Sequence, residues 1–415
     1  MNKEKVLVIA TTFPRWENDT EATFVKDLCI EISKEFEVHV LVPHYKGLKF
    51  KEKVGNLYMH RFPYFYPYKY QKLAYGGILP NLKKNPLLFL QAPFLFISML
   101  INTIKIIKND RIKVIHAHWF FPQGLIAALC TKYFKIKSMV TIHAGGILAL
   151  NSIPLIKRPI SNFILKNTTI VISVSSFGKN LLKDMVSKRF RSVVENKLKV
   201  IPMGVYTKRF NIKKDKQKLK EKYGIKNKWA ILFIGRLAEK KGVKYLIKAL
   251  PLIKNLNYIL LIIGEGPLKK DLIRNVNKLN LNEKVKFLGY VSEKEKIDYL
   301  LLSNILIVPS ITTKKGDTEG LPAVIMEGVS THIPIIATDV GGIRDIIKNN
   351  VNGILIEEKN SKQIVEKIGY IIDNKKFREK LIKNAKLTSK NYDWRKISKK
   401  NIILLNKLIN SRENF

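Results

Sequence analysis

The stretch from Trp229 to Gly242 reads WAILFIGRLAEKKG: six apolar residues are followed at once by a glycine and a group of charged residues. An apolar run of about four to eight residues that ends at a turn residue is typical of a strand buried on both faces of a sheet. Runs of this kind alternate with helical patterns throughout the chain. The pattern therefore predicts an α/β protein built from parallel, doubly wound sheets covered by helices.

The predicted strands fall in both halves of the chain. Those of the first half are 6–10, 38–42, 57–61, 114–117, 138–142 and 170–174, and those of the second half are 231–234, 258–263, 284–287, 305–308, 335–338 and 353–356. Between the first two strands, apolar residues at helical spacing predict a helix from Thr23 to Phe36. Each half is thus expected to form a Rossmann-like domain.

A boundary between two domains is expected because 415 residues exceed what one hydrophobic core usually supports. A further predicted strand begins at Lys199 and ends in a Pro/Gly turn, and a charged stretch follows. This pattern predicts that the chain divides after residue 206. We expect domain one to cover residues 1–206 and domain two to cover 207–394, with a cleft between them. The final helix, within 395–415, is expected to complete domain one.

The net charge of +42 arises from 75 Lys and Arg against 33 Asp and Glu. Clustered cations bind nucleic acid, but here they are scattered through both halves, so we expect no nucleic-acid partner. Two interpretations stay open: a compositional bias without function, or attraction to an anionic membrane, where each basic residue contributes roughly 1 kcal/mol. The cysteines, Cys29 and Cys130, lie far apart, which fits a reducing cytoplasmic compartment and offers neither a disulfide nor a metal site.

Two glutamates stand eight positions apart in the segment from Gly316 to Glu327, which reads GDTEGLPAVIME. Because a helix repeats every ~3.6 residues, Glu319 is expected at the mouth of a short helix and Glu327 on the same face two turns further in. The backbone N–H groups of Gly320 and Leu321 would then be unpaired donors at a helix N-terminus. Such donors favour an anion, for example a diphosphate.

Cations that suit such an anion stand upstream, in the turn after the 231–234 strand. Arg236 and Lys241 belong to this turn, and ligands bind beyond the carboxyl ends of strands in open α/β sheets. Taken singly, each motif has a plainer explanation, since charged residues usually lie solvated on the surface. Their occurrence together favours a binding site.

The two motifs together resemble the donor half of family 4 glycosyltransferases. That family combines a Gly-Arg…Lys-Gly turn with a Glu-x7-Glu motif, which continues into a Pro-Ile-(Ile/Val)-Ala-Thr strand and a Gly-Gly pair. Here the continuation is the segment from Pro334 to Asp345, which reads PIIATDVGGIRD. The resemblance implies the GT-B fold, in which two Rossmann-like domains face each other across a cleft.

The resemblance also implies an activity. A hexosyl group would move from a nucleoside-diphosphate sugar, linked to UDP or GDP, to an acceptor hydroxyl with retention of configuration. Arg236 and Lys241 would neutralise the leaving diphosphate. Glu319 would steady the sugar, and Glu327 would accept from the ribose hydroxyls. The donor-binding set is then Arg236, Lys241, Tyr290, Glu319, Gly320, Leu321 and Glu327. The chain contains no Asp-x-Asp motif, so neither a metal nor another cofactor is expected.

A histidine at the end of a first-half strand joins the expected catalytic residues. His143 follows a predicted strand in a Thr-x-His turn, where the family places a histidine near the reacting centre; a hydrogen-bonded structural histidine is the alternative. His116 and His118 are expected to be structural. The catalytic set is then Glu319, His143, Arg236 and Lys241. Many relatives carry an aspartate where this chain has Gly146, so the sugar cannot be inferred from the resemblance.

The apolar segment 86–101 is interrupted by Gln91, Pro93 and Ser98. It is shorter than the about 20 residues that cross a bilayer, so we do not expect it to span. A monotopic helix in the headgroup region and a helix buried against the first sheet both stay open. We expect a cytoplasmic protein, with peripheral contact to an anionic membrane as the open alternative. The acceptor would be a glycan or a lipid-linked sugar, a precursor of a cell-surface polysaccharide or glycolipid.

Two other functions compete with the transferase. A Gly-x-Gly turn at Gly264 and Gly266 suggests a dinucleotide-binding oxidoreductase, but the third glycine and the downstream acid of that motif are missing. The other is an inactive, basic scaffold of the same fold that binds membrane or polymer. The presence of all four charged residues of the donor motifs argues against this scaffold.

Overall fold

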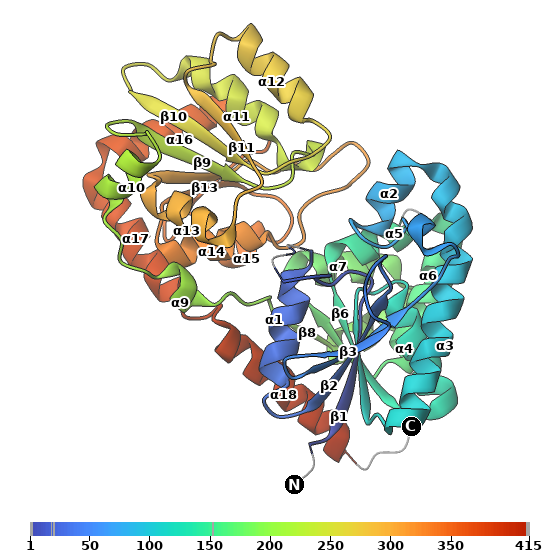
Figure 1. Ribbon diagram of the computed structural model, residues 1–415. Helices are drawn as coiled ribbons and strands as arrows, with labels where there is room; N and C mark the ends of the chain where they lie inside the picture. The colour runs from blue at the N-terminus through green and yellow to red at the C-terminus, as the bar shows by residue number, and fades with distance from the viewer. Residues whose placement is uncertain (1–2, 18, 20, 152, 412–415) are drawn as a thin grey trace. The chain divides into compact units, whose positions relative to one another are not determined.

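The computed structural model describes residues 3–17, 19, 21–151 and 153–411. The chain divides into two compact units. The first unit is Met1–Gly204 with Trp394–Phe415, and the second is Val205–Asp393. Each unit consists of one sheet with helices on both faces (Figure 1). The boundaries between the units fall after Gly204 and after Asp393, within two residues of the limits that the sequence predicts.

The sheet of the first unit has, within the described residues, eight strands in the order β3-β4-β2-β1-β5-β6-β7-β8. They are β1 Lys5–Ile9, β2 Glu37–Pro43, β3 Lys51–Val54, β4 Leu57–Phe62, β5 Val114–His118, β6 Lys137–Ile142, β7 Ile170–Ser173 and β8 Leu198–Val200. Neighbouring strands are parallel except β3 and β4. The sequence did not predict β3, because its four residues, KEKV, are mostly charged and exposed. Charged residues of this kind suit a strand at the edge of a sheet.

Helices cover both faces of the first sheet. Figure 1 shows α1 (Thr23–Ile32) and α18 (Trp394–Asn410) on one side, and α3 (Ala92–Asp110) and α4 (Gln123–Phe134) on the other. The remaining helical segments are η1 Tyr68–Tyr70, α2 Ile78–Lys84, η2 Pro86–Gln91, α5 Ala144–Asn151, α6 Pro154–Asn167, α7 Ser176–Met185, η3 Lys188–Phe190 and α8 Arg191–Lys197. The prediction that α1 extends to Phe36 is wrong. The helix ends at Ile32, and residues 33–35 continue as turns.

The sheet of the second unit has six strands among the described residues, all parallel, in the order β11-β10-β9-β12-β13-β14. They are β9 Trp229–Ile234, β10 Tyr258–Ile263, β11 Val285–Gly289, β12 Ile305–Val308, β13 Ile335–Thr338 and β14 Ile354–Ile356. Strands of a parallel sheet are covered on both faces, which is why their sequences are almost continuously apolar. Every strand that the sequence predicts in either half is present, with ends shifted by no more than a few residues.

Helices also cover both faces of the second sheet. Figure 1 shows α11, α12 and α16 on one side of the sheet and α13 and α14 on the other. The helical segments of this unit are α9 Thr207–Phe210, α10 Lys216–Lys222, η4 Glu239–Lys241, α11 Val243–Ala249, η5 Leu250–Leu252, α12 Lys269–Lys278, α13 Glu293–Leu302, α14 Ala323–Thr331, α15 Ile343–Ile346, α16 Ser361–Asp373 and α17 Lys375–Ser389. The core residues between α11, α16 and the sheet are almost all Ile, Leu and Val.

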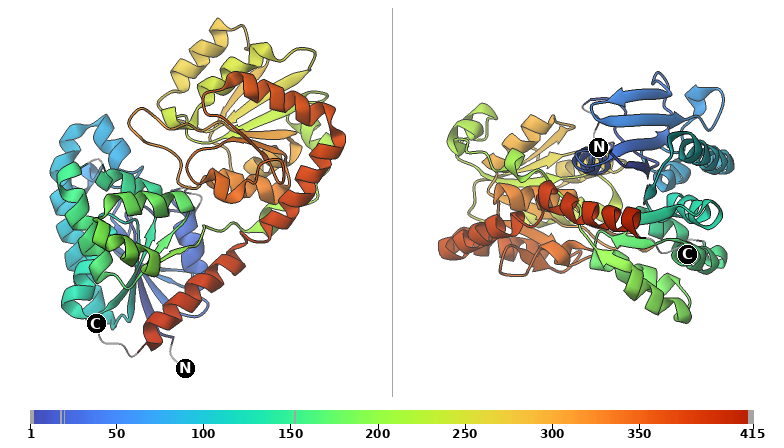
Figure 2. Two further views of the ribbon diagram at one scale, coloured as in Figure 1. Left: turned by 180° about the vertical axis from the view of Figure 1, so that it is seen from behind. Right: turned by 90° about the horizontal axis from the view of Figure 1, so that it is seen from below.

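The last helix of the chain belongs to the first unit. Figure 2 shows α18, in red, beside the helix α1, and the two helices are in contact. Its first residue, Trp394, is only 2% exposed. The indole packs so closely on Gly204 that a Cβ at that glycine would lie 2.5 Å from an indole carbon. The chain leaves the first unit at Gly204 and returns to it at Trp394, so these two residues are packed against each other.

The apolar segment 86–101 is part of a longer helical stretch than predicted. Within the described residues, Pro86–Asp110 alone has the length and apolar composition of a membrane span, and 22% of its most apolar window is buried. The prediction that the segment is too short to span is therefore wrong as a statement about length. However, Leu95, Met99 and Ile106 on α3 are buried against the sheet. One face of α3 is thus core, and its other face is exposed.

Candidate active site

The loops that follow the strands of the second sheet carry most of the predicted site residues. Arg236 and Lys241 follow β9, Glu319 lies in the segment after β12, and Tyr290 follows β11. Carboxyl ends of parallel strands meet at one edge of a sheet, and open α/β sheets bind ligands at that edge. The structure therefore brings these four residues to the same edge of the second unit.

Lys241 and Glu319 form an ion pair at this edge. Lys241 Nζ lies 2.9 Å from Glu319 Oε1, and the two side chains are 17% and 8% exposed. The contact lacks hydrogen-bond geometry, so Oε1 has no hydrogen-bond partner among the described residues. Taking a carboxylate out of water is unfavourable unless a cation compensates it. The pair therefore holds an acidic group in a nearly dry position while keeping its capacity to accept hydrogen bonds.

Close contacts between backbone segments fix the position of Glu319. Gly341, just after β13, has a φ of +57°, and a Cβ there would lie 1.9 Å from Glu319 O. Gly242, next to Lys241, has a φ of +63°, and a Cβ there would lie 1.8 Å from Pro309 O. Only glycine avoids these backbone clashes and also adopts a positive φ without strain. The two glycines thus allow the loops carrying Lys241 and Glu319 to approach each other.

The helix that follows Glu319 starts later than the sequence predicted. α14 begins at Ala323, with Pro322 as its N-cap residue. Glu319 therefore lies in the loop before the helix, as predicted, but Glu327 is only the fifth residue of α14 and not two turns into it. The residue before a proline is disfavoured in the helical conformation, which prevents the helix from beginning at Leu321. Among the described residues, no side chain caps this end of α14. The first N–H groups of a helix have no partner within it, so those at the start of α14 are candidate donors for an anion. Gly320 and Leu321, the donors that the sequence predicted, lie before this helix.

Glu327 has a different cationic partner from Glu319. Lys296, on α13, lies 2.7 Å from Glu327 Oε1, and both side chains are largely buried. The sequence analysis missed Lys296, which is one of many lysines and is separated from Glu327 by 31 residues. No local pattern links the two positions, and only the packing of α13 beside α14 reveals the pair.

Lys240, which the sequence analysis also missed, contacts the same loop as Lys241, the loop that carries Asp317 and Glu319. Lys240 lies 3.2 Å from Asp317 Oδ1 and donates to Thr318 O at 3.4 Å. Two consecutive lysines therefore bind two acids that are two positions apart, Asp317 and Glu319. This matched spacing of Lys-Lys and Asp-x-Glu is a signal that the sequence did contain.

Arg236 and Tyr290 extend from the same edge into solvent. Tyr290 is 77% exposed, directly after the last residue of β11. Arg236 is exposed too and takes part in none of the ion pairs within the described part of the chain. Gly320 is half-buried and Leu321 is buried beside Glu319. The exposed side chains of Arg236 and Tyr290 are thus available to a ligand at this edge.

His143 belongs to the first unit, at the end of β6. It is 7% exposed, and its Nε2 lies 3.1 Å from His118 Nδ1. The rings of Phe24 and Trp119 pack against the imidazole of His143, with centroid distances of 4.9 and 5.1 Å. Burial lowers the pKa of His143 to about 3. The imidazole is therefore neutral at physiological pH and acts through hydrogen bonds rather than through charge.

His116 and His118 lie behind His143 in the same unit. Both are buried, and His116 Nε2 lies 2.8 Å from Thr141 Oγ1. Burial lowers the pKa of His116 to about 3 and that of His118 well below its usual range. The ring of His116 packs on that of His118, with a centroid distance of 4.4 Å, and His118 in turn is hydrogen-bonded to His143, so the three neutral histidines form a row that ends at His143.

Comparison with known proteins matches both units. The family Glycosyltransferase Family 4 matches residues 22–209, and Glycosyl transferases group 1 matches residues 215–388. An uncharacterized glycosyltransferase of Methanocaldococcus jannaschii is 32% identical over 338 residues, which are 79% of this chain and 84% of the relative. The chain belongs to glycosyltransferase family 4.

Two further similarities concern function and fold. A UDP-Gal:alpha-D-GlcNAc-diphosphoundecaprenol alpha-1,3-galactosyltransferase of Escherichia coli is 27% identical over 66% of this glycosyltransferase and 70% of its own length. The Anabaena protein HepE, solved in complex with UDP, superposes with a TM-score of 0.72 at 16% identity, covering 97% of this chain and all of HepE. The GT-B fold predicted for the chain, with its two Rossmann-like domains, is confirmed.

The Lys241–Glu319 pair of this glycosyltransferase can be tested by a double-mutant cycle. Lys241→Met and Glu319→Gln should each lower the free energy of unfolding, because each leaves one buried charge unpaired. The double variant should lose less than the sum, with a coupling of about 0.5–3 kcal/mol. Denaturant unfolding measures all four proteins. Effects that add to within a few tenths of a kcal/mol would show that the two charges do not interact.

Proposed function

We propose that this glycosyltransferase moves a hexosyl group from a nucleoside-diphosphate sugar to an acceptor hydroxyl, with retention of configuration. The donor would bind at the loop edge of the second unit. The observation that carries this proposal is the Lys241–Glu319 ion pair beside the uncapped start of α14. It combines a cation, an acid and backbone N–H donors, which are the groups that a sugar diphosphate requires.

The leaving diphosphate gains negative charge as the glycosidic bond to the sugar breaks. Lys241 and Arg236 supply positive charge to it, and the N-terminus of α14 adds backbone donors and the positive end of a helix dipole. Groups already oriented toward the developing charge stabilise the transition state without reorganising, and removing one typically costs about 10²–10³ in rate. These residues of the chain can meet the charge themselves, so we propose a transfer without metal or other cofactor.

The two glutamates take separate roles in this proposal. Glu319 accepts hydrogen bonds from the transferred sugar through the oxygen that its ion pair leaves without a hydrogen bond. Glu327 accepts from the ribose hydroxyls; its ion pair with Lys296 engages Oε1, and an ionised carboxylate offers about four acceptor positions. Tyr290, exposed at the end of β11, stacks on the base. Gly320 and Leu321 contribute backbone to the diphosphate site.

Of the two donors expected, we propose a UDP-sugar rather than a GDP-sugar. The Escherichia coli relative is named for UDP-Gal, and the Anabaena structure contains UDP. The name of the same Escherichia coli relative specifies an acceptor sugar on diphosphoundecaprenol, a lipid carrier. We accordingly propose a lipid-linked sugar as acceptor, in the assembly of a cell-surface polysaccharide or glycolipid.

A lipid-linked acceptor requires access to a membrane, and the first unit has a suitable surface. The exposed face of η2 and α3, here called the apolar face, consists of Leu87, Phe89, Leu90, Phe94, Ile97 and Ile101, whose exposed fractions range from 45% to 74%. Lys83 and Lys84, both exposed, precede it on α2. Apolar side chains flanked by cations suit the headgroup region of an anionic bilayer. We propose that this apolar face holds the enzyme peripherally at the cytoplasmic side of the membrane.

Substitutions in the donor site test the proposed function. Lys241→Ala and Glu319→Ala should each lower donor hydrolysis and transfer at least about a hundredfold, because each removes a group that acts on the diphosphate or the sugar. His143→Ala should also lower transfer. Glu366→Ala, on an exposed part of α16, is the matched control and should retain full turnover. Normal turnover by folded Lys241→Ala and Glu319→Ala would disprove the site assignment.

The donor base can be identified by thermal stabilisation. A ligand at 100 times its dissociation constant stabilises the folded state by about 2.7 kcal/mol. We expect UDP to raise the melting temperature more than GDP does. UMP should raise it less than UDP, because UMP has only one phosphate and lacks the second, which Lys241 would bind. Equal shifts for UMP and UDP would contradict a diphosphate site.

Flotation with lipid vesicles tests the proposed membrane contact. The wild type should float with vesicles that contain anionic lipid, less at high salt, because salt screens the attraction of Lys83 and Lys84. Phe94→Ser should reduce flotation, whereas Tyr133→Ser, at an exposed aromatic residue of α4, should not. Absence of flotation, or flotation that is insensitive to salt and to Phe94→Ser, would overturn the proposal.

A further inference from the structure

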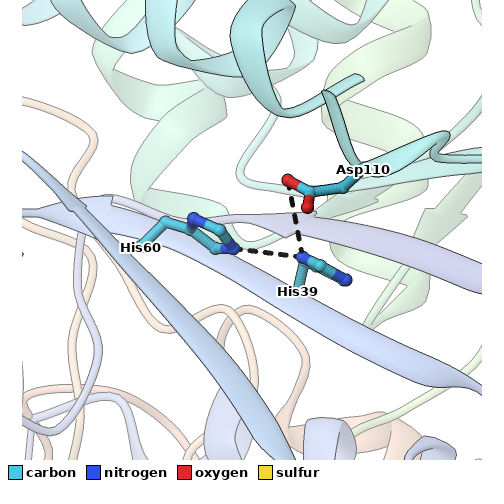
Figure 3. A group of neighbouring side chains, drawn as sticks. All are labelled: His39, His60 and Asp110. Carbon is cyan, nitrogen blue, oxygen red and sulfur yellow. Dashed lines mark hydrogen bonds and ion pairs between the residues drawn. The ribbon is translucent and has the colours of Figure 1, made fainter. Parts of the chain in front are cut away.

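Three potential metal ligands meet in the first unit, away from the residues discussed so far. They are His39 on β2, His60 on β4 and Asp110, the last residue of α3 (Figure 3). His39 Nδ1 lies 3.0 Å from His60 Nε2 and 4.0 Å from Asp110 Oδ2. One atom from each residue lies within 4.8 Å of the other two. Figure 3 shows both rings and the carboxylate directed toward a common point.

The fold brings these residues together from three separate elements. In the parallel pairing of β2 with β4, Leu41 is the register partner of His60, so His39, Leu41 and His60 lie on one face of the sheet. Leu41 packs in the core that α3 covers. The end of α3 therefore delivers Asp110 to the face that carries both histidines. His39 and His60 are 21 positions apart in sequence, and Asp110 is further still from both. Only the packing of β2, β4 and α3 brings the three side chains together.

We propose that His39, His60 and Asp110 bind a divalent transition-metal ion, with Zn²⁺ as the first candidate. Imidazole nitrogen and carboxylate oxygen are the ligands that such ions prefer, and three protein ligands leave a fourth position for water. Nothing in the proposed transferase chemistry uses this group. The ion would be bound in addition to that activity.

The neighbour of His39 supports this assignment. His39 Nε2 lies 3.0 Å from Glu37 Oε1, which assigns the proton to Nε2 and leaves Nδ1 as the nitrogen that faces His60 and Asp110. Metal-binding histidines usually donate their second ring N–H to a carboxylate in this way, which orients the ring and raises its basicity. Glu37 thus acts on the ion through His39 rather than by direct contact.

The observed distances need only small adjustments to accommodate Zn²⁺. Ligands at about 2.0–2.1 Å in a tetrahedral arrangement lie about 3.3 Å from one another. The two ring nitrogens, at 3.0 Å, would move apart slightly, and the Asp110 oxygen, at 4.0 Å from His39 Nδ1, would approach by rotation of its side chain. The present contact between the two ring nitrogens requires one proton between them, and the ion would replace that proton.

Access and charge also permit an ion. The side chain of His39 is only 4% exposed, but that of Asp110 is 32% exposed and opens the group to solvent. Lys51, the register partner of His60 on β3, is an opposing cation; it is exposed, so its ammonium group can extend into water. The ion would connect the end of α3 to β2 and β4. Its expected role is to hold the helix that carries the apolar face against the sheet.

Metal binding to the full-length protein tests the proposal. After removal of metal with a chelator, the wild type should bind one equivalent of Zn²⁺ in competition with a chromophoric chelator, and Co²⁺ should give the visible absorption of a tetrahedral site. Asp110→Ala and His60→Ala should lose this equivalent. Glu37→Gln should weaken binding about 10–100-fold without abolishing it, as expected for a group that orients a ligand.

Matched controls distinguish the site from adventitious binding. His44→Gln alters a buried histidine of the same unit that lies outside the group, and this variant should bind Zn²⁺ like the wild type. Zn²⁺ should raise the melting temperature of the wild type and His44→Gln, but not that of Asp110→Ala, whose residue is partly exposed and tolerates substitution. Absence of binding by the wild type, or equal binding by Asp110→Ala and His60→Ala, would overturn the proposal.

Discussion

The candidate active site depends on two points where one loop's backbone lies against another's. Gly341 contacts the carbonyl of Glu319, and Gly242 contacts the carbonyl of Pro309, both too closely for any Cβ. Through these contacts the segments after β9, β12 and β13 converge at the edge of the second sheet. The ion pair between Lys241 and Glu319, and the uncapped start of α14 beside it, follow from this convergence. A sugar diphosphate would meet groups that are already in place.

The sequence predicted the elements of the fold because their signals are local. Apolar runs between turn residues located the parallel strands correctly, whereas β3 was missed because a charged edge strand lacks that pattern. The position of α14 was mispredicted although the deciding residue was visible: Pro322 excludes a helical start at Leu321. Glu319 lies in the loop before the helix, as predicted, but the later start of α14 means that two helical turns do not separate it from Glu327.

The site was predicted in part for the same reason. Lys241 and Glu319 belong to motifs that can be recognised in the sequence, and the structure pairs them. Lys296 and the group of His39, His60 and Asp110 depend on tertiary packing between distant elements, for which the sequence offers no local signal. In the first unit, His143 follows a strand as predicted, but burial makes it neutral, which could not be inferred from its position in the sequence.

The central claim is that Lys241 and the start of α14 bind the diphosphate of the donor. A crystal structure of the protein with UDP tests it most directly. The account predicts diphosphate oxygens within hydrogen-bond distance of Lys241 Nζ and of backbone N–H groups between Gly320 and the first turn of α14. A nucleotide bound elsewhere, or a diphosphate that leaves both Lys241 and this helix end without contact, would contradict it.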